Sequence, residues 1–225
     1  MADRLASPRF LWAGVIAPIL FTGVYLVDGA TRTGYEPLRH QVSLLSLGDR
    51  GWVQVLSFLL TGALLVVFAI ALRARLRPGP GARGCPLGIA VSGTGFILAG
   101  VFTTQPMFGY PPGAPAGMAT DITPTSAIHV MAAMLLFFGL VGAAAVHASR
   151  SWRTGDRGWA AASATVAVVV LVAFGASGGG PSGELLLPAY AGLVQRIALV
   201  IGLGWVLALA LQSLQRAAAG GPMVA

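Results

Sequence analysis

Six long runs of apolar residues restrict this chain more than any other feature of its sequence. They lie at about 10–28, 52–72, 86–104, 125–147, 158–177 and 190–212. Each run is close to the roughly 20 residues that cross the hydrocarbon core of a bilayer as an α-helix. The runs are continuously apolar and lack the two-residue alternation of a barrel strand. The sequence therefore predicts an all-α, polytopic membrane protein, with six transmembrane helices in a compact bundle that forms one domain over residues 1–216.

The composition agrees with a membrane environment. Hydrophobic residues make up 56% of the chain and charged residues 9%, whereas a soluble domain carries about 25% charged residues. The net charge of +7 comes from arginine, because the chain contains no lysine. These arginines lie in short segments between the apolar runs and not on one solvated face beside aromatic residues. We therefore expect no nucleic-acid binding.

The arginines also indicate how the chain crosses the membrane. Ten of them lie in the N-terminus, the second loop, the fourth loop and the C-terminus: Arg4, Arg9, Arg73, Arg75, Arg77, Arg83, Arg150, Arg153, Arg157 and Arg216. The other loops hold three, Arg32, Arg39 and Arg50. Because arginine-rich segments stay in the cytoplasm, we expect a multi-pass protein of the plasma membrane with both termini cytoplasmic. Residues 217–225 would then form a flexible cytoplasmic tail.

The loops on the opposite, outer side are built differently. Residues 105–124 contain five prolines, which predict an irregular segment covering the helix ends. Residues 39–50 place Arg39, Ser43, Ser46 and Arg50 at helical spacing, with apolar residues on another face. This pattern predicts a short amphipathic helix in the first outer loop, at the membrane interface.

The third apolar run carries a stripe of small residues, Gly88, Ser92, Gly95 and Ala99. Such a stripe lets another helix approach closely. The partner is either a helix of the same chain or a second copy, so the sequence leaves oligomerisation through this stripe open.

Ionisable residues inside a membrane are costly and are therefore candidates for function. His129 lies about one turn below the outer end of the fourth run, and Arg196 nearly two turns into the sixth. The ligand-binding candidates near this level are Arg39, His40, Ser43, Gln105, His129 and Arg196. The catalytic candidates are Glu36, Asp121, His129 and Glu184.

Structural roles compete with each of these assignments. Arg196 could pair with a carboxylate such as Glu184 or Asp121, or extend toward the membrane surface. His129 could be a hydrogen-bonded structural histidine, and Ser43 a solvated or capping serine. No zinc, haem or iron–sulfur ligand spacing is present in the sequence, so we expect no metal and no cofactor.

The segment from Gly34 to Gly48, followed by Gly51 and Trp52, resembles the first-loop motif of a bacterial six-span membrane family known as domain of unknown function nine hundred and ninety-eight. Further segments resemble other motifs of that family: 102–106 with 109–113, 128–129 and 192–196. The resemblance covers about residues 10–212 and implies a six-span topology without a reaction. Family members tend to have an aspartate where this chain has Gln105.

Three functions follow from the outer polar residues. The first is binding of an amphiphilic or lipid-like small molecule, such as a membrane lipid, with Arg39 and Arg196 holding an anionic group. The second is a small membrane enzyme acting on a lipid or isoprenoid substrate, in which Glu36, Asp121 or Glu184 delivers a proton. Transport is the weakest, because the sequence has no evident inverted repeat.

Overall fold

The computed structural model describes residues 7–76, 81–119, 121–178 and 187–219. Within these ranges the regular secondary structure is helical. The elements are η1 (Pro8–Trp12), α2 (Ala13–Ala30), η2 (Val42–Ser46), α3 (Gly51–Arg75), α4 (Gly84–Val101), α5 (Pro124–Arg153), α6 (Arg157–Ala176), η3 (Pro188–Tyr190) and α7 (Ala191–Ala218). The prediction of an all-α fold is confirmed.

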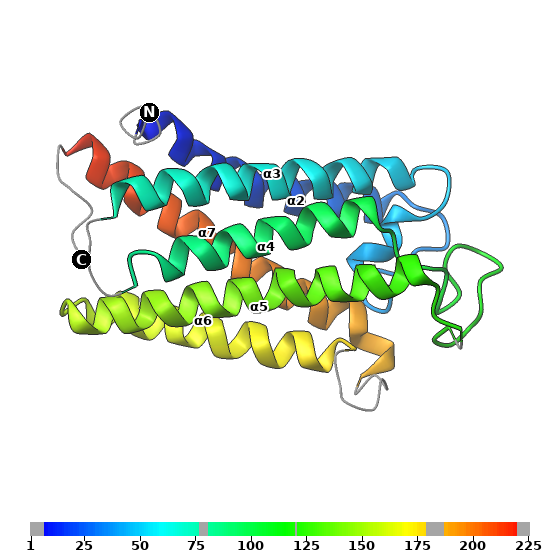
Figure 1. Ribbon diagram of the computed structural model, residues 1–225. Coiled ribbons are helices and arrows are strands. Elements are labelled where there is room, and N and C mark those ends of the chain that lie inside the picture. Colours follow the sequence, from blue (N-terminus) through cyan, green and yellow to red (C-terminus); the bar gives the residue numbers. More distant parts are fainter. Residues whose placement is uncertain (1–6, 77–80, 120, 179–186, 220–225) are drawn as a thin grey trace.

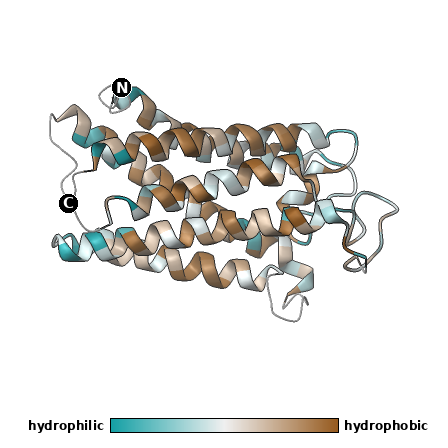
Figure 2. Cartoon of the chain, viewed as in Figure 1, coloured by the Kyte–Doolittle hydropathy of each residue, from teal (hydrophilic) through white to brown (hydrophobic). Residues whose placement is uncertain are grey.

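Six of the helical segments are long and apolar enough to cross a membrane. They run side by side along one bundle (Figure 1). Figure 2 shows that apolar residues predominate along the middle of these helices and polar residues near the helix ends. Large apolar side chains also cover the outside of the bundle, for example Val27, which is 67% exposed. A bilayer covers such a surface at no cost, so the chain is a multi-pass membrane protein.

The predicted runs match the observed helices closely, with differences at their ends. The third run ends earlier, because α4 stops at Val101. Three helices are longer than predicted, since α3 continues to Arg75, α5 to Arg153 and α7 to Ala218. Pro18 lies inside α2 without ending it. Of the predicted tail, residues 220–225 lie outside the described part of the chain.

The small-residue stripe of α4 packs against α5 of the same chain. A Cβ atom on Gly88 would lie 2.7 Å from the backbone nitrogen of Ala143 and the carbonyl oxygen of Gly139. A Cβ atom on Gly95 would lie 2.6 Å from the carbonyl oxygen of Ala132. The stripe therefore serves contact within the chain. The oligomeric state itself remains a prediction.

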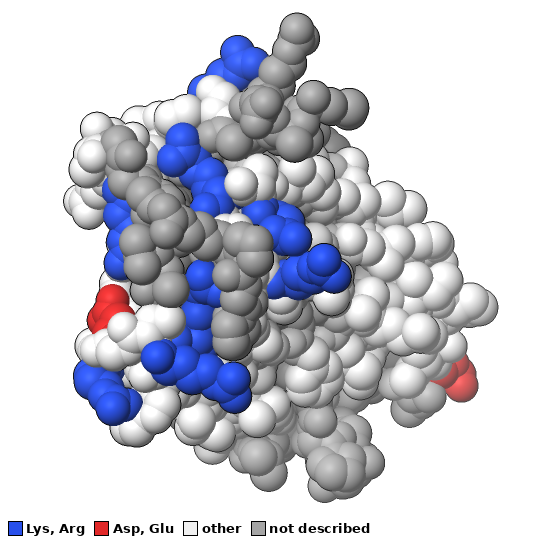
Figure 3. All heavy atoms as spheres, turned by 60° about the vertical axis from the view of Figure 1, so that its left-hand side comes forward, with Lys and Arg blue, Asp and Glu red and all other residues white. Residues whose placement is uncertain are grey.

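The two ends of the bundle differ in charge and in covering. At one end, on the right of Figure 1, residues 31–50 and 102–119 fold over the helix ends. We call these two segments the cap and this end the cap end. Arginines gather at the opposite, basic end, as Figure 3 shows. Among the described residues they are Arg9, Arg73, Arg75, Arg83, Arg150, Arg153, Arg157 and Arg216, with Asp156 as the acidic residue there.

Candidate functional site

Arg196 lies at the centre of the cap end and is only 9% exposed. Its Nη1 donates hydrogen bonds to the carbonyl oxygens of Pro37, His40 (2.9 Å) and Gly192 (2.9 Å). Its Nη2 donates to the hydroxyl of Tyr35. The guanidinium therefore binds backbone carbonyls and a phenol, and not the carboxylate of Asp121, which is exposed. The other predicted partner, Glu184, lies outside the described residues.

The first turn of α7 binds the same stretch of backbone. The N–H group of Gly192 donates to the carbonyl of Arg39 (3.1 Å), and that of Leu193 donates to the carbonyl of Leu38 (2.9 Å). Helix N-termini carry N–H groups without partners inside the helix, and the cap satisfies two of them here. Together with Arg196, α7 thus binds four consecutive carbonyls, those of residues 37–40.

Glycine is required at position 192 by this close approach. A Cβ atom there would collide with the carbonyl oxygen of His40 and lie 2.6 Å from that of Pro37. Both obstacles are backbone atoms that already accept hydrogen bonds from Arg196. They cannot move aside without breaking those bonds.

Tyr35 connects Arg196 to the first cap segment. Its hydroxyl oxygen lies 3.1 Å from the carbonyl oxygens of His40 and Gln41, to which it donates. Burial raises the pKa of Tyr35 to about 12, although Arg196 acts to lower it. The hydroxyl therefore stays protonated at neutral pH and both donates and accepts in this network.

His40 joins the two segments of the cap. The N–H group of Glu36 donates to its Nδ1 (2.9 Å), so Nε2 carries the hydrogen and donates to the carbonyl of Phe108 (3.0 Å). The ring also lies within 5.5 Å of the ring of Tyr110, measured between centroids. Both nitrogens of His40 are therefore engaged within the protein.

A buried ion pair lies beside this network. Asp28 is 2% exposed and pairs with Arg32 at 2.8 Å and with Arg50 at 2.6 Å. Arg32 also donates to the carbonyls of Leu45 and Leu47 and to the hydroxyl of Tyr110. Sequence reasoning did not assign a site role to Arg32 or Tyr35. The spacing of Asp28 and Arg32, four residues apart at a helix end, is a signal that could have identified this pair.

The predicted amphipathic helix at 39–50 is not formed. The structure has only the five-residue 3₁₀ helix η2, all of whose residues are buried. Its backbone is bonded from several sides, with Arg32 bound to the carbonyl of Leu45 and the N–H group of Val42 donating to Oε1 of Gln195 (2.8 Å). Ser43 therefore faces the protein interior and not the membrane interface.

The remaining predicted residues lie apart from one another. Arg39 donates to the carbonyl of Ala116 (3.1 Å) in the other cap segment. The amide of Gln105 donates to the carbonyl of Asp121 (2.8 Å) and accepts from the N–H group of Thr123 (2.9 Å), so both of its ends are engaged. The side chains of Glu36 and Asp121 are exposed and do not lie in an apolar cavity. The cap therefore does not bring the predicted acids and arginines together around a ligand.

Two predicted residues do meet, at a central cavity of about 20 Å³ beneath η2. Its polar lining consists of Ser43, His129 and Gln195, and apolar residues such as Phe21 and Phe58 complete the wall. Nδ1 of His129 lies 2.7 Å from the carbonyl oxygen of Phe102. Since a carbonyl only accepts, Nδ1 carries the hydrogen and Nε2 is left as a hydrogen-bond acceptor. The volume is sufficient for about one water molecule.

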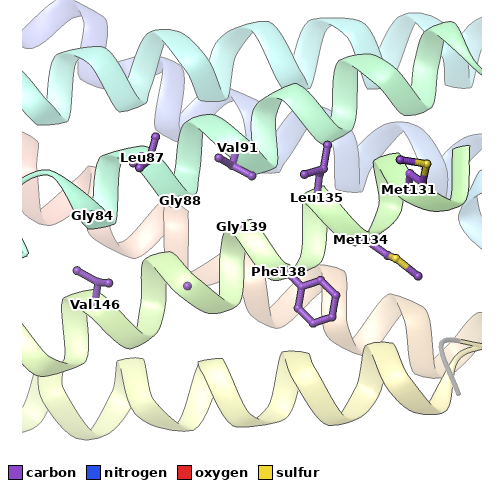
Figure 4. Close-up of a pocket in the computed structure, with 11 residues that line it drawn as sticks. Gly84, Leu87, Gly88, Val91, Met131, Met134, Leu135, Phe138, Gly139 and Val146 are labelled. Carbon is purple, nitrogen blue, oxygen red and sulfur yellow. The ribbon is translucent and has the colours of Figure 1, made fainter. Parts of the chain in front are cut away.

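A much larger groove of about 640 Å³ lies between α4 and α5 on the lipid-facing side. Figure 4 shows its wall. The lining residues are apolar or glycine: Gly84, Leu87, Gly88, Val91, Met131, Met134, Leu135, Phe138, Gly139, Gly142 and Val146. Of these glycines, sequence reasoning considered Gly88, and only for packing. The combination of glycines and flexible methionines on facing helices is the signal that it missed.

No group of three or more His, Cys, Asp or Glu side chains among the described residues could hold a metal ion. The prediction that the protein needs no cofactor remains untested.

Comparison with known proteins identifies a family. A family model described as a protein of unknown function (DUF998) matches residues 15–212. Neither the curated proteins nor the solved structures contain a significant match. The matched region agrees with the resemblance seen in the sequence motifs, whose family assignment is confirmed.

Proposed function

This chain belongs to the DUF998 family, and we propose that it binds a membrane lipid by holding a hydrocarbon chain in the groove between α4 and α5. The observation that carries the proposal is the groove itself, with a volume of about 640 Å³ and an apolar lining. Pockets for small molecules commonly measure about 300–1,000 Å³. Met131 and Met134 add flexible side chains that adapt to chains of different shape.

The groove supports lipid binding better than the cap does. A ligand at Arg196 would have to displace the carbonyls of Pro37, His40 and Gly192 from its guanidinium. Each displaced carbonyl would lose a charge-assisted hydrogen bond in a buried site. Lipid binding in the groove breaks no hydrogen bond of this kind, because the wall of the groove offers only apolar contacts.

The basic end supplies a place for the head group. Gly84 and Val146 line the groove at its basic end, where a Cβ atom on Gly84 would lie 3.0 Å from Val146. Arg83 directly precedes Gly84 and is exposed. A lipid whose chain lies in the groove can therefore bring an anionic head group to Arg83. We propose that this end is cytoplasmic, that both termini lie there and that the membrane is the plasma membrane, in accordance with the positive-inside rule.

The test fills the groove and measures lipid retention. A phenylalanine at Gly142 would place its ring at the groove, and its Cβ atom would have no neighbour within 4 Å. Gly204 in α7 is the matched control, since it has equally open surroundings and does not line the groove. Native mass spectrometry of both variants should show loss of bound lipid in Gly142→Phe and retention in Gly204→Phe. Equal retention in both folded variants would refute the proposal.

A further inference from the structure

The groove between α4 and α5 is long as well as apolar. On α5 its lining runs from Met131 to Val146, and Figure 4 shows these residues spread along the helix. The two residues are fifteen positions apart, which is about 22 Å along an α-helix. A volume of about 640 Å³ that extends over this length belongs to a long, narrow groove. Such a shape fits a chain lying lengthwise better than a compact molecule.

The contacts between the two helices show where the groove lies relative to the middle of the membrane. The shortest of the six spans is α4, with 18 residues. It is about 27 Å long, close to the roughly 30 Å of the hydrocarbon core. Its middle, at Ser92 and Gly93, therefore marks the midplane. A Cβ atom on Gly139 of α5 would lie 2.6 Å from the backbone nitrogen of Ser92, which places Gly139 near the midplane as well.

The groove extends to both sides of this level. Val146 lies seven residues from Gly139 toward the basic end, or about 10 Å. Met131 lies eight residues from Gly139 toward the cap end, or about 12 Å. Each leaflet contributes about 15 Å of hydrocarbon. A chain that begins at the basic end and stays within its own leaflet would therefore leave the part of the groove around Met131 and Met134 unfilled.

The charges beside the groove favour one head group over two. Arg83 lies at the basic end of the groove, directly before Gly84. On the cap side of Gly139, the described residues of α4 and α5 include no Asp, Glu, Lys or Arg. Two phospholipids, one from each leaflet, would place the second head group where neither helix offers it a charge. One molecule that enters from the basic end needs a single charged contact.

The side of the groove is open to the surrounding lipid. Leu87, Met131 and Phe138 are 63%, 64% and 52% exposed. A hydrocarbon chain can therefore enter sideways from the bilayer without passing through water, whatever its length. Methionine side chains adapt to irregular shapes, so Met131 and Met134 can pack against a chain that carries methyl branches.

We infer, on the basis of the proposed function, that the lipid in the groove is anionic and has one hydrocarbon chain long enough to cross the midplane, as polyprenyl phosphates do. Its phosphate lies at Arg83, and its chain follows α5 past Gly139 to Met131. A glycerophospholipid fits the groove less well, because each of its two chains matches the thickness of one leaflet.

Competition followed by native mass spectrometry tests this inference on the full chain, freed of lipid in detergent. Undecaprenyl phosphate, farnesyl phosphate and phosphatidylglycerol are added in equal amounts. All three carry an anionic phosphate, and the farnesyl chain is short enough to stay within one leaflet. One molecule of undecaprenyl phosphate should bind, several-fold more often than either competitor. Equal binding of the three lipids, or a preference for two molecules of phosphatidylglycerol, would overturn the inference.

A tryptophan at Met131 tests whether the chain passes the midplane, because it fills the far part of the groove. Met131→Trp should reduce the binding of undecaprenyl phosphate several-fold and leave that of farnesyl phosphate unchanged. Val130→Trp is the matched control, since Val130 is the neighbouring residue, is 47% exposed and does not line the groove. Two variants with the same affinity for undecaprenyl phosphate would show that the chain does not reach Met131, against the inference.

Gly142→Phe separates a failure of this inference from a failure of lipid binding in the groove. Gly142 lines the groove on the basic side of Gly139, so a ring there obstructs short and long chains alike. If the three lipids bind equally and all are lost in Gly142→Phe, the groove binds lipid without this selectivity, and only the inference fails. If Gly142→Phe retains all three, the groove is not the binding site, and both fail.

Discussion

The guanidinium of Arg196 donates a hydrogen bond to the hydroxyl of Tyr35, and the same hydroxyl donates to the carbonyls of His40 and Gln41. Since Arg196 also binds the carbonyl of His40 directly, the two side chains and the cap backbone form a closed set of hydrogen bonds. The free-energy cost of burying an arginine in a membrane helix is thus offset by hydrogen bonds within the chain.

Replacement of Arg196 should destabilise the protein. Arg196→Gln leaves the carbonyl of Pro37 without its side-chain donor and removes one of the two donors to the carbonyl of His40, so we expect a loss of about 3 kcal/mol in the free energy of unfolding. Arg39→Gln is the control, because Arg39 makes its bond to Ala116 at an exposed position, and it should cost less than about 1 kcal/mol. Thermal unfolding in detergent measures both. Equal melting temperatures for the two variants would contradict this assignment.

The hydroxyl of Tyr35 should titrate well above the ordinary pKa of a tyrosine. Its pKa is raised from 10.0 to about 12, chiefly by burial. The folded state therefore holds this proton more tightly than the unfolded state. The stabilisation is complete below pH 10 and is lost as the pH rises from 10 toward about 12. Ultraviolet titration should show a late tyrosinate step whose amplitude falls by one tyrosine in Tyr35→Phe; an unchanged amplitude would contradict the assignment.

A methyl group at Gly192 should separate the cap from α7. Gly192→Ala forces a Cβ atom against the carbonyls of Pro37 and His40, and overpacking of this kind costs about 1–3 kcal/mol. The same change at Gly204, where nothing lies within 4 Å, should instead stabilise α7 by up to about 1 kcal/mol through helix propensity. Unfolding measurements on the two variants should therefore shift in opposite directions. A neutral Gly192→Ala would show that the close contact is not maintained.

Arg83 should determine which lipid head group is preferred. Native mass spectrometry with equal amounts of phosphatidylglycerol and phosphatidylcholine should show a preference for the anionic lipid in wild-type protein. Arg83→Gln should reduce that preference, because it removes the charge beside Gly84 at the end of the groove. Arg73→Gln, at another exposed arginine of the basic end, should retain it. Equal losses in both variants would indicate a general effect of charge.

The membrane helices could be predicted because the bilayer fixes their length and forbids unpaired backbone. The positions at which these helices end were predicted less accurately. Polar residues such as Ser151 and Arg153 extend α5 beyond its apolar run, since a helix continues past the hydrocarbon wherever its backbone hydrogen bonds are kept. The family motifs around Gly34 and Gly192 also identified the two segments that meet at the cap.

The partners of Arg196 could not be predicted, because they are mostly backbone carbonyls and every residue carries one. The pattern of Ser43 and Ser46 suggested a solvated face, yet long-range bonds from Arg32 and Gln195 hold that segment inside. The groove was equally hidden. The groove depends on how α4 and α5 are placed relative to each other, and on the fact that Gly139 and Gly142 have no side chain to fill it.

The four carbonyls that bind α7 belong to the main chain, so this contact does not depend on which side chains residues 37–40 carry. Leu38 is 54% exposed, yet its carbonyl holds the N–H group of Leu193. A tilt of α7 would consequently move residues 37–40 together with the helix. A fluorescent label at Leu38 would report movements of a helix that lies mostly inside the membrane, from a position that aqueous reagents can reach.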